Sequence, residues 1–236
     1  MKKFAPLCLL ALTPLAHADF WGVKGDIGLW RPDYSGSLAD GAYHLSDIGY
    51  GHEDHIYAHL YVEHFIPLVP NFRLSIVEGD SERSVNSPMP TNGNAGDVLT
   101  TGVDLSHVDI TAYYELLDNW VKLDLGLSLR KFDGGVSIAT PMGSDSLDMD
   151  DAIPLLYLQA ELELPFTGWS LGVEGNYTEY DDYEVSDYSV RLRYLFDAVL
   201  DLGFEIGYRD LQVDFSQSFG ADISQGGPFA GFAFHF

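Results

Sequence analysis

The chain ends in Gly226-Gly-Pro-Phe-Ala-Gly-Phe-Ala-Phe-His-Phe236, which carries the strongest fold signal in the sequence. Alternate positions from Ala230 to Phe236 are apolar, and three of them are phenylalanine. This period of two predicts a β-strand with one strongly apolar face. In a soluble protein such a final strand would be an aggregation-prone edge, whereas in a closed membrane barrel lipid covers the face and no edge remains. The stretch therefore favours a membrane-spanning β-barrel over a soluble sandwich.

The N-terminus has the parts of a secretory signal peptide. The basic start Met1-Lys2-Lys3 is followed by an apolar run at 7–12 and by an A-x-A cleavage site at 16–18. We predict that residues 1–18 are removed and that 19–236 form one outer-membrane barrel domain. The apolar run is too short to span a membrane as a helix. Cleavage also removes Cys8, the only cysteine, so the mature chain has no disulfide and no thiol site.

The mature chain is strongly acidic. Loss of Lys2 and Lys3 leaves ten basic residues against 36 acidic ones, a net charge of −26. This charge argues against nucleic acid as a partner. The 14 tyrosines and 14 phenylalanines are too many for a disordered chain. No mature stretch offers the roughly 18 uncharged apolar residues of a spanning helix, so a membrane form must be built from strands.

Polar and apolar residues alternate along most of the mature chain. We predict ten strands, at 20–31, 54–66, 72–80, 104–116, 120–132, 152–164, 169–180, 186–196, 199–210 and 226–236. Eight is the alternative if 72–80 and 169–180 are misread. Short connections (67–71, 117–119, 165–168, 197–198) alternate with long ones (32–53, 81–103, 133–151, 211–225), apart from 181–185. Short periplasmic turns, long external loops and an even strand count are typical of outer-membrane barrels with both termini in the periplasm.

The alternation also divides charge unequally between two faces. The polar face carries seven basic residues: Lys24, Arg73, Lys122, Arg130, Arg191, Arg193 and Arg209. It also carries eleven acidic residues: Asp26, Glu63, Asp109, Glu115, Asp124, Glu161, Glu163, Glu174, Asp187, Asp201 and Glu205. A soluble lipocalin-like barrel would place the apolar face inside, and parity alone does not say which face is in. Because the loops are nearly all acidic while the bases gather on this face, we predict a membrane barrel with an ion-paired lumen.

Taken together, the signal peptide, the alternation and the terminal Phe236 resemble the small outer-membrane β-barrel proteins of Gram-negative bacteria, most closely an uncharacterised family of about this length. The resemblance implies a transmembrane up-and-down antiparallel barrel, in contact with outer-membrane lipid and lipopolysaccharide. It also implies recognition by the barrel assembly machinery through Phe232, Phe234 and Phe236. It supplies no functional residues.

His107 and Asp109 are weak candidates for a catalytic pair, because they are neighbours on the polar face near the outer end of a predicted strand. A histidine beside a carboxylate can orient a water or hydroxyl for attack. Neighbouring strand ends, however, supply no second pair of this kind and no outstanding serine. An interior hydrogen-bonded role is the alternative, and we favour it.

Acidic residues cluster in the predicted loop 133–151, at Asp145, Asp148, Asp150 and Asp151. Their carboxylates are weak candidates for divalent-cation binding, including the ions that bridge lipopolysaccharide, although the EF-hand pattern is absent. A solvated acidic surface explains them more economically. We predict no cofactor.

These patterns favour a non-enzymatic integral outer-membrane barrel with acidic external loops, which serves envelope structure, surface binding or small-solute passage. One alternative is a barrel enzyme, lipid A-modifying or protease-like, with its site at the extracellular rim. Another is a transporter of small apolar molecules.

Overall fold

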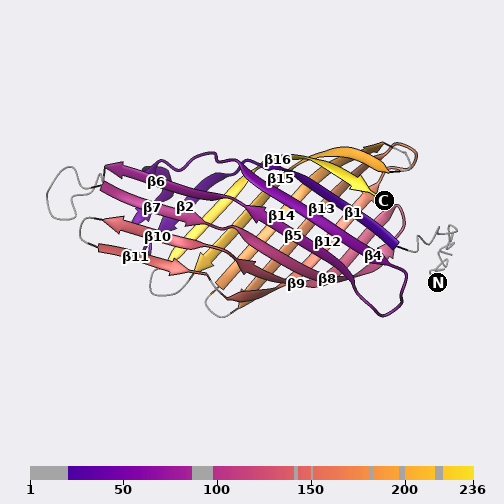
Figure 1. Cartoon of the computed structure of the whole chain (residues 1–236), viewed down its shortest axis with the longest axis horizontal. Coiled ribbons are helices and arrows are strands. Elements are labelled where there is room, and N and C mark those ends of the chain that lie inside the picture. Colours follow the sequence, from indigo (N-terminus) through magenta and orange to yellow (C-terminus); the bar gives the residue numbers. More distant parts are fainter. Residues whose placement is uncertain are drawn as a thin grey trace, which may run out of the picture.

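The computed structural model describes residues 21–86, 98–140, 143–149, 151–180, 183–196, 200–215 and 220–236, so the predicted signal peptide at 1–18 lies outside it. Within these residues ten strands form a closed antiparallel barrel (Figure 1). They are β1 (Trp21–Trp30), β4 (His55–His64), β5 (Asn71–Glu78), β8 (His107–Asp118), β9 (Val121–Phe132), β12 (Ala152–Glu163), β13 (Trp169–Tyr180), β14 (Tyr183–Phe196), β15 (Asp201–Phe215) and β16 (Ala221–His235). Their order around the barrel follows the sequence, and β1 pairs with β16 to close it. The prediction of ten strands is confirmed.

The C-terminal strand closes the barrel as its alternation predicts. Phe232 lies opposite Ile27 of β1, and Phe236 exchanges two backbone hydrogen bonds with Val23, at 2.8 and 2.9 Å. Gly25 is required here because a Cβ at this position would lie 2.7 Å from the backbone carbonyl of His59 and 2.8 Å from the ring of Phe234. Phe232 and Phe236 are 76% and 72% exposed, so the apolar face of the last strand points outward.

The same orientation holds around the barrel and answers the question that parity leaves open. On β9, Leu127 is 65% exposed while Arg130 is completely buried. On β8, Ile110 points outward and Asp109 inward. An apolar exterior around a charged interior is the polarity of a membrane barrel and the reverse of a lipocalin. In the part of the chain that is described, no helix is long and apolar enough to cross a bilayer.

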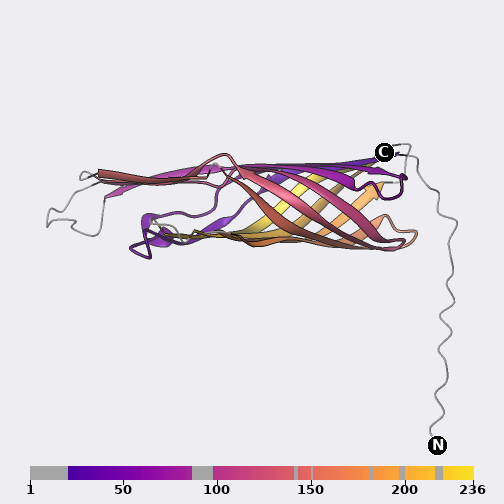
Figure 2. The same cartoon turned by 90° about the horizontal axis from the view of Figure 1, so that it is seen from below.

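A second antiparallel sheet extends from one end of the barrel. Its order is β11 (Gly143–Asp148), β10 (Gly135–Thr140), β7 (Val98–Asp104) and β6 (Asp80–Asn86). Opposite it, β2 (Asp33–Leu38) pairs with the first residues of β16, and β3 (Tyr43–His44) and the short helix α1 (Leu45–Ile48) follow. Figure 2 shows these two walls facing each other, at the end away from the C-terminus.

The predicted long connections are therefore largely strand, which corrects the sequence analysis. The stretches 32–53, 81–103 and 133–151 contain β2, β3, β6, β7, β10 and β11. Of the predicted loop 211–225, β15 takes the residues up to Phe215 and β16 those from Ala221. In these segments apolar side chains occupy the inward positions and polar ones the outward positions, which is the reverse of the barrel strands. Their small apolar clusters pack against the opposite wall, and this packing stabilises them as strands.

Candidate functional site

The lumen is crossed by a connected network of ion pairs. Near its outer end Arg130 on β9 donates two hydrogen bonds to the carboxylate of Asp109 on β8, both at 2.8 Å. The same guanidinium reaches Asp187 on β14 at 2.6 Å, and Asp187 accepts two more bonds from Arg209 on β15. Because β8 and β9 lie across the barrel from β14 and β15 in strand order, these charges bridge the lumen. Arg209 also lies over the Trp30 ring, 4.8 Å from its centroid.

A second bridge lies next to the first. Arg73 on β5 donates to Glu174 on β13 at 2.6 Å, and Arg191 on β14 approaches the other oxygen of Glu174 at 3.3 Å. Strands β5 and β13 are separated by three barrel strands on the side of β8, so this contact also spans the interior. Two arginines thus share one carboxylate, and Nε and Nη1 of Arg73 have no hydrogen-bond partner in the structure.

A third group joins β1, β4, β14 and β15. Arg193 binds Glu205 at 2.7 Å and Asp26 at 3.1 Å. His59 contacts the other oxygen of Asp26 at 2.6 Å, and the Tyr57 hydroxyl donates to Glu205 at 2.9 Å. Each carboxylate therefore has two partners from different strands. This cross-linking is what an enclosed charged lumen requires, because an unpaired buried charge is costly.

The end of the lumen near the termini holds the two lysines. Lys24 binds Glu63 at 2.5 Å, and Lys122 binds Glu163 at 2.8 Å. All seven basic residues assigned to the lumen by parity thus have a carboxylate within 3.3 Å. The predicted ion-paired lumen is present. The acidic residues assigned to the lumen by parity outnumber the basic ones, eleven to seven.

Among the carboxylates of the described residues, Asp124 is the one that is buried with an unpartnered oxygen. It is buried, its Oδ1 has no hydrogen-bond partner in the structure, and it lies directly opposite Glu115 in the β8–β9 register. Like charges directly opposite each other on neighbouring strands are destabilising. Glu115 is held by the side-chain amide of Asn71 at 3.1 Å.

Little free space remains between these groups. The void in the middle of the lumen is lined by Arg73, Glu174, Arg191 and Glu205 among others and measures about 20 Å³. A single water needs roughly 10–15 Å³ of such volume. The void therefore accommodates about one water molecule.

Beyond the ion pairs, the inward-facing side chains change from charged to apolar. On β15 the inward series continues from Arg209 to Leu211, Val213 and Phe215, while the outward series changes from Tyr208 to Asp210. On β14 the inward series changes from Asp187 to Val185. The change marks the point at which the strands leave the lipid, since their exterior becomes polar there.

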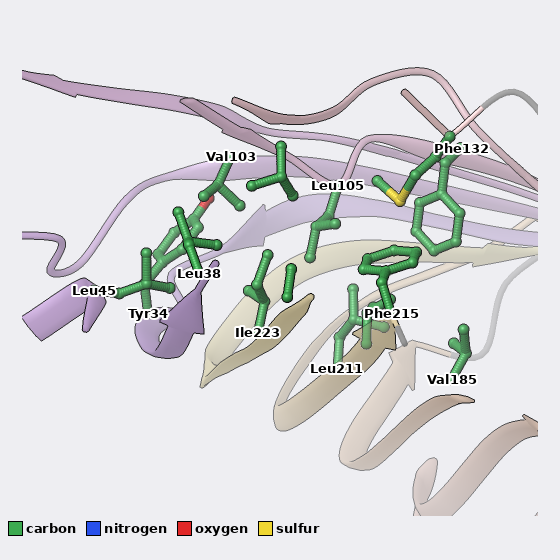
Figure 3. Close-up of a cluster of buried hydrophobic side chains, with 14 of the residues drawn as sticks. Tyr34, Leu38, Leu45, Val103, Leu105, Phe132, Val185, Leu211, Phe215 and Ile223 are labelled. Atoms are coloured by element: carbon green, nitrogen blue, oxygen red, sulfur yellow. The ribbon is translucent and has the colours of Figure 1, made fainter. Parts of the chain in front are cut away.

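The apolar residues beyond this point form an outer cap that closes the barrel mouth (Figure 3). Side chains from the second sheet and its connections meet those of the opposite wall. Labelled examples are Val103, Leu105 and Phe132 on one side, and Leu38, Leu211, Phe215 and Ile223 on the other. All are buried. The cap is thus a small two-layer core stacked on a charged lumen.

Two tyrosines inside the cap have paired hydroxyls. The Tyr34 hydroxyl bonds to His55 Nε2 at 2.9 Å, and the Tyr50 hydroxyl donates to the carbonyl of Thr101 at 3.0 Å. Burial raises the pKa of both Tyr34 and Tyr50 above the ordinary value for tyrosine, so the two phenols stay protonated. Arg83 also lies over the Tyr50 ring. Tyr50 thereby ties the segment after α1 to β7.

His107 and Asp109 lie at the base of this cap, and both are buried. His107 Nδ1 is 2.7 Å from the carbonyl of Leu105, so this nitrogen carries the proton. Its Nε2 is 3.2 Å from Arg209, and because a guanidinium can only donate, Nε2 is an acceptor. Asp109 is held by Arg130. The two residues share a face, as parity predicts, but each is bound to an arginine and neither nitrogen of the histidine is free.

The structure separates the acidic residues proposed for cations. On β11, Asp145 and Asp148 alternate onto opposite faces, Asp151 lies before β12, and Asp150 is outside the described residues. Within the described ranges, no three His, Cys, Asp or Glu side chains are arranged to hold a metal ion. Asp148 instead borders a groove of about 450 Å³ on the outer face of the second sheet, together with Asp80, Glu82, Asp104 and Asp133.

The outer cap and its pairs, Tyr34–His55 and Tyr50–Thr101, were not predicted from the sequence. A signal was present, because Val185 and Leu211 continue the parity of Asp187 and Arg209 with only the polarity reversed. The alternation therefore persists through the cap. What parity does not supply is the opposite wall that buries those residues.

No family model matches the sequence, and no curated protein matches it. Among solved structures, the chain is similar to the outer membrane protease OmpT from Escherichia coli, with 12% identity, a TM-score of 0.47, and coverage of 93% of this chain and 98% of that one. It is also similar to a Pseudomonas aeruginosa FadL homologue, with 7% identity, a TM-score of 0.42, and coverage of 92% and 90%. The fold itself is that of a transmembrane β-barrel, and its own geometry establishes this.

Proposed function

We propose that the protein is a non-enzymatic barrel of the Gram-negative outer membrane that conducts no solutes and presents an acidic external surface for envelope structure or binding. The observation that carries the proposal is the closed interior. Three cross-lumen groups of ion pairs fill the barrel, and an apolar cap lies over its outer mouth. The void between them has room for about one water molecule.

The location rests on the apolar exterior and on the predicted signal peptide at 1–18. It implies that lipid and lipopolysaccharide surround the barrel and that the assembly machinery recognises Phe232, Phe234 and Phe236. The acidic groove beside Asp104 faces outward at the base of the second sheet, and weak divalent-cation binding to external carboxylates stays a prediction.

Two other functions have less support. An enzyme acting on lipid A or peptides would need a reacting group that substrate can reach, whereas His107 and Asp109 are buried and bound to arginines. A transporter of small apolar molecules would need an apolar path, whereas the lumen is charged and the apolar cap is packed. Both features favour the closed, non-enzymatic barrel.

Planar bilayer recording tests the proposal. We expect purified protein to give no stable porin-like current. A matched variant, Arg73→Ser, removes one arginine of a bridge without leaving a lone charge, because Glu174 keeps Arg191 as its partner. It should stay closed because the outer cap remains. Large ohmic channels from the native protein would contradict the closed lumen and favour solute passage.

A further inference from the structure

The turns at the terminus end of the barrel carry large apolar side chains. In the β4–β5 turn Leu68 is 92% exposed, and in the β12–β13 turn Phe166 is fully exposed. Ile66, Val69 and Leu164 beside them are also exposed. Short periplasmic turns facing water have no reason to display such residues, since an exposed apolar patch marks an interaction surface.

The backbone at these two positions is unusual. Leu68 has a φ of +69° and Phe166 a φ of +65°, in the left-handed region that bulky side chains rarely adopt. Each follows a proline, and Thr167 donates its backbone N–H to Leu164, which makes Phe166 the third residue of a hydrogen-bonded turn. Glycine is the usual residue at that place after proline. Holding a leucine and a phenylalanine there is unfavourable for the backbone, so the side chains must contribute something in return.

Hydrogen bonds fix the direction of each turn. Tyr114, a lipid-facing residue of β8, donates its hydroxyl to the carbonyl of Leu68 at 3.0 Å. The β4–β5 turn is therefore pinned to the outer wall of the barrel and not to its lumen. Thr167 fixes the other turn, since its hydroxyl donates to Leu164 at 2.7 Å and accepts the N–H of Trp169.

The height of the apolar belt identifies what covers these turns. On β9 outward apolar residues run from Val121 to Leu129, but on β5 they run only from Phe72 to Ile76. At about 3.4 Å per residue and a tilt of about 40°, these stretches cover about 21 Å and about 10 Å of depth, against an apolar band of about 25 Å. The β5 stretch is too short by itself. The exposed apolar residues of the adjoining turn continue the belt at its lower end.

We propose that the β4–β5 and β12–β13 turns insert Leu68 and Phe166 into the phospholipid leaflet at the terminus end of the barrel, where they anchor it at a fixed depth. The occupant of this surface is lipid, because the surface is continuous with the lipid-facing belt. The left-handed backbone after Pro67 and Pro165 holds the two side chains away from the barrel end. This inference does not depend on whether the lumen conducts or the protein is an enzyme.

Spin labels on single cysteines test the insertion, because a chain beginning at Asp19 contains no other cysteine. Leu68→Cys and Phe166→Cys are labelled and refolded into vesicles of a zwitterionic phospholipid, and collision with oxygen is compared with collision with a water-soluble nickel complex. Leu127→Cys, in the belt, and Asp118→Cys, at the exposed last residue of β8 at the same end, are the matched controls. We expect an oxygen-to-nickel ratio at 68 and 166 close to that at 127 and several-fold above that at 118.

A ratio equal to that at Asp118 would show that the two side chains stay in water although lipid is available, and it would overturn the proposal. A second protein, which these vesicles lack, would then be the occupant of the surface. Glycine variants give an independent readout. Leu68→Gly and Phe166→Gly relieve the left-handed backbone, so they would raise the urea midpoint in vesicles if the side chains did nothing. We expect the midpoint to fall, and a rise in both variants would refute the anchoring role.

Discussion

Removing Arg130 should be among the most damaging single changes to this barrel. Arg130 is completely buried, donates two bonds to Asp109 and reaches Asp187. Asp187 keeps Arg209 when Arg130 is lost, but Asp109 has no other base among the described ion pairs. Arg130→Met keeps most of the volume while leaving that carboxylate buried and alone. Breaking a buried pair in this way costs about 3–5 kcal/mol.

Two further variants show whether the loss comes from the stranded charge. Arg130→Met combined with Asp109→Asn removes the lone carboxylate, so it should recover more than half of the loss. Lys122→Met breaks the pair with Glu163, which is 46% exposed at its side chain, so it should cost only about 0–1 kcal/mol. The expected loss of stability differs between Arg130 and Lys122 because the Arg130 pair is buried and the Lys122 pair is partly open to solvent.

The measurement is reversible urea unfolding of protein refolded into vesicles, followed by tryptophan fluorescence and by heat-modifiable gel migration. The free energy of unfolding is compared among the native chain, the two single variants and the double variant. An Arg130→Met loss below about 1 kcal/mol would refute the reasoning. So would a double variant less stable than Arg130→Met, since the stranded carboxylate would then not be the cause.

Three other outcomes are expected. Deleting Phe236 removes two backbone hydrogen bonds to β1 and the terminal aromatic, so the yield in the outer membrane should fall; an unchanged yield would argue against the role of this residue in closure. His107→Ala leaves an N–H donor of Arg209 without an acceptor, so the free energy of unfolding should fall by about 1–3 kcal/mol. Mass spectrometry of lipid A and of peptide substrates should give the same result for the native protein and the variant, and a modification made only by the native protein would instead support the enzyme alternative. Asp124→Asn removes a carboxylate with an unpartnered oxygen opposite Glu115, so it should raise stability by up to about 1 kcal/mol, and a clear loss would show that Asp124 has a favourable partner in the membrane.

The positions of the barrel strands could be predicted because alternation is a local property. Strand 169–180 has the predicted bounds, and the closing contacts of Phe232 and Phe236 follow from the last eleven residues. Parity also placed Arg130, Asp109 and their partners on one face before any pairing was known. A side chain's face depends only on its position along its own strand.

The candidate site was only partly predictable for the same reason. Parity predicts that His107 and Asp109 are neighbours, but their true partners, Arg209 and Arg130, come from other strands. Arg209 is 102 residues from His107 along the chain. No local pattern encodes which inward side chain will meet another across a lumen, because that depends on how the barrel closes and on the stagger of its strands.

The sequence by itself determined ten strands of alternating polarity, with the charged residues on one face and a C-terminal strand that has an apolar, aromatic face. It could do so because the spacing of residues along a strand is local. The distribution of charge between the strands and the loops also predicted that the charged face is inside. Only the tertiary structure decided which arginine meets which carboxylate, and that Leu211 and Phe215, in a predicted loop, belong to strand β15 and pack in an apolar cap. Those outcomes need a second surface brought from far along the chain. Alternation determines which face of its own strand a side chain occupies. Whether that face is buried depends on a second segment, distant in the sequence, that packs against it.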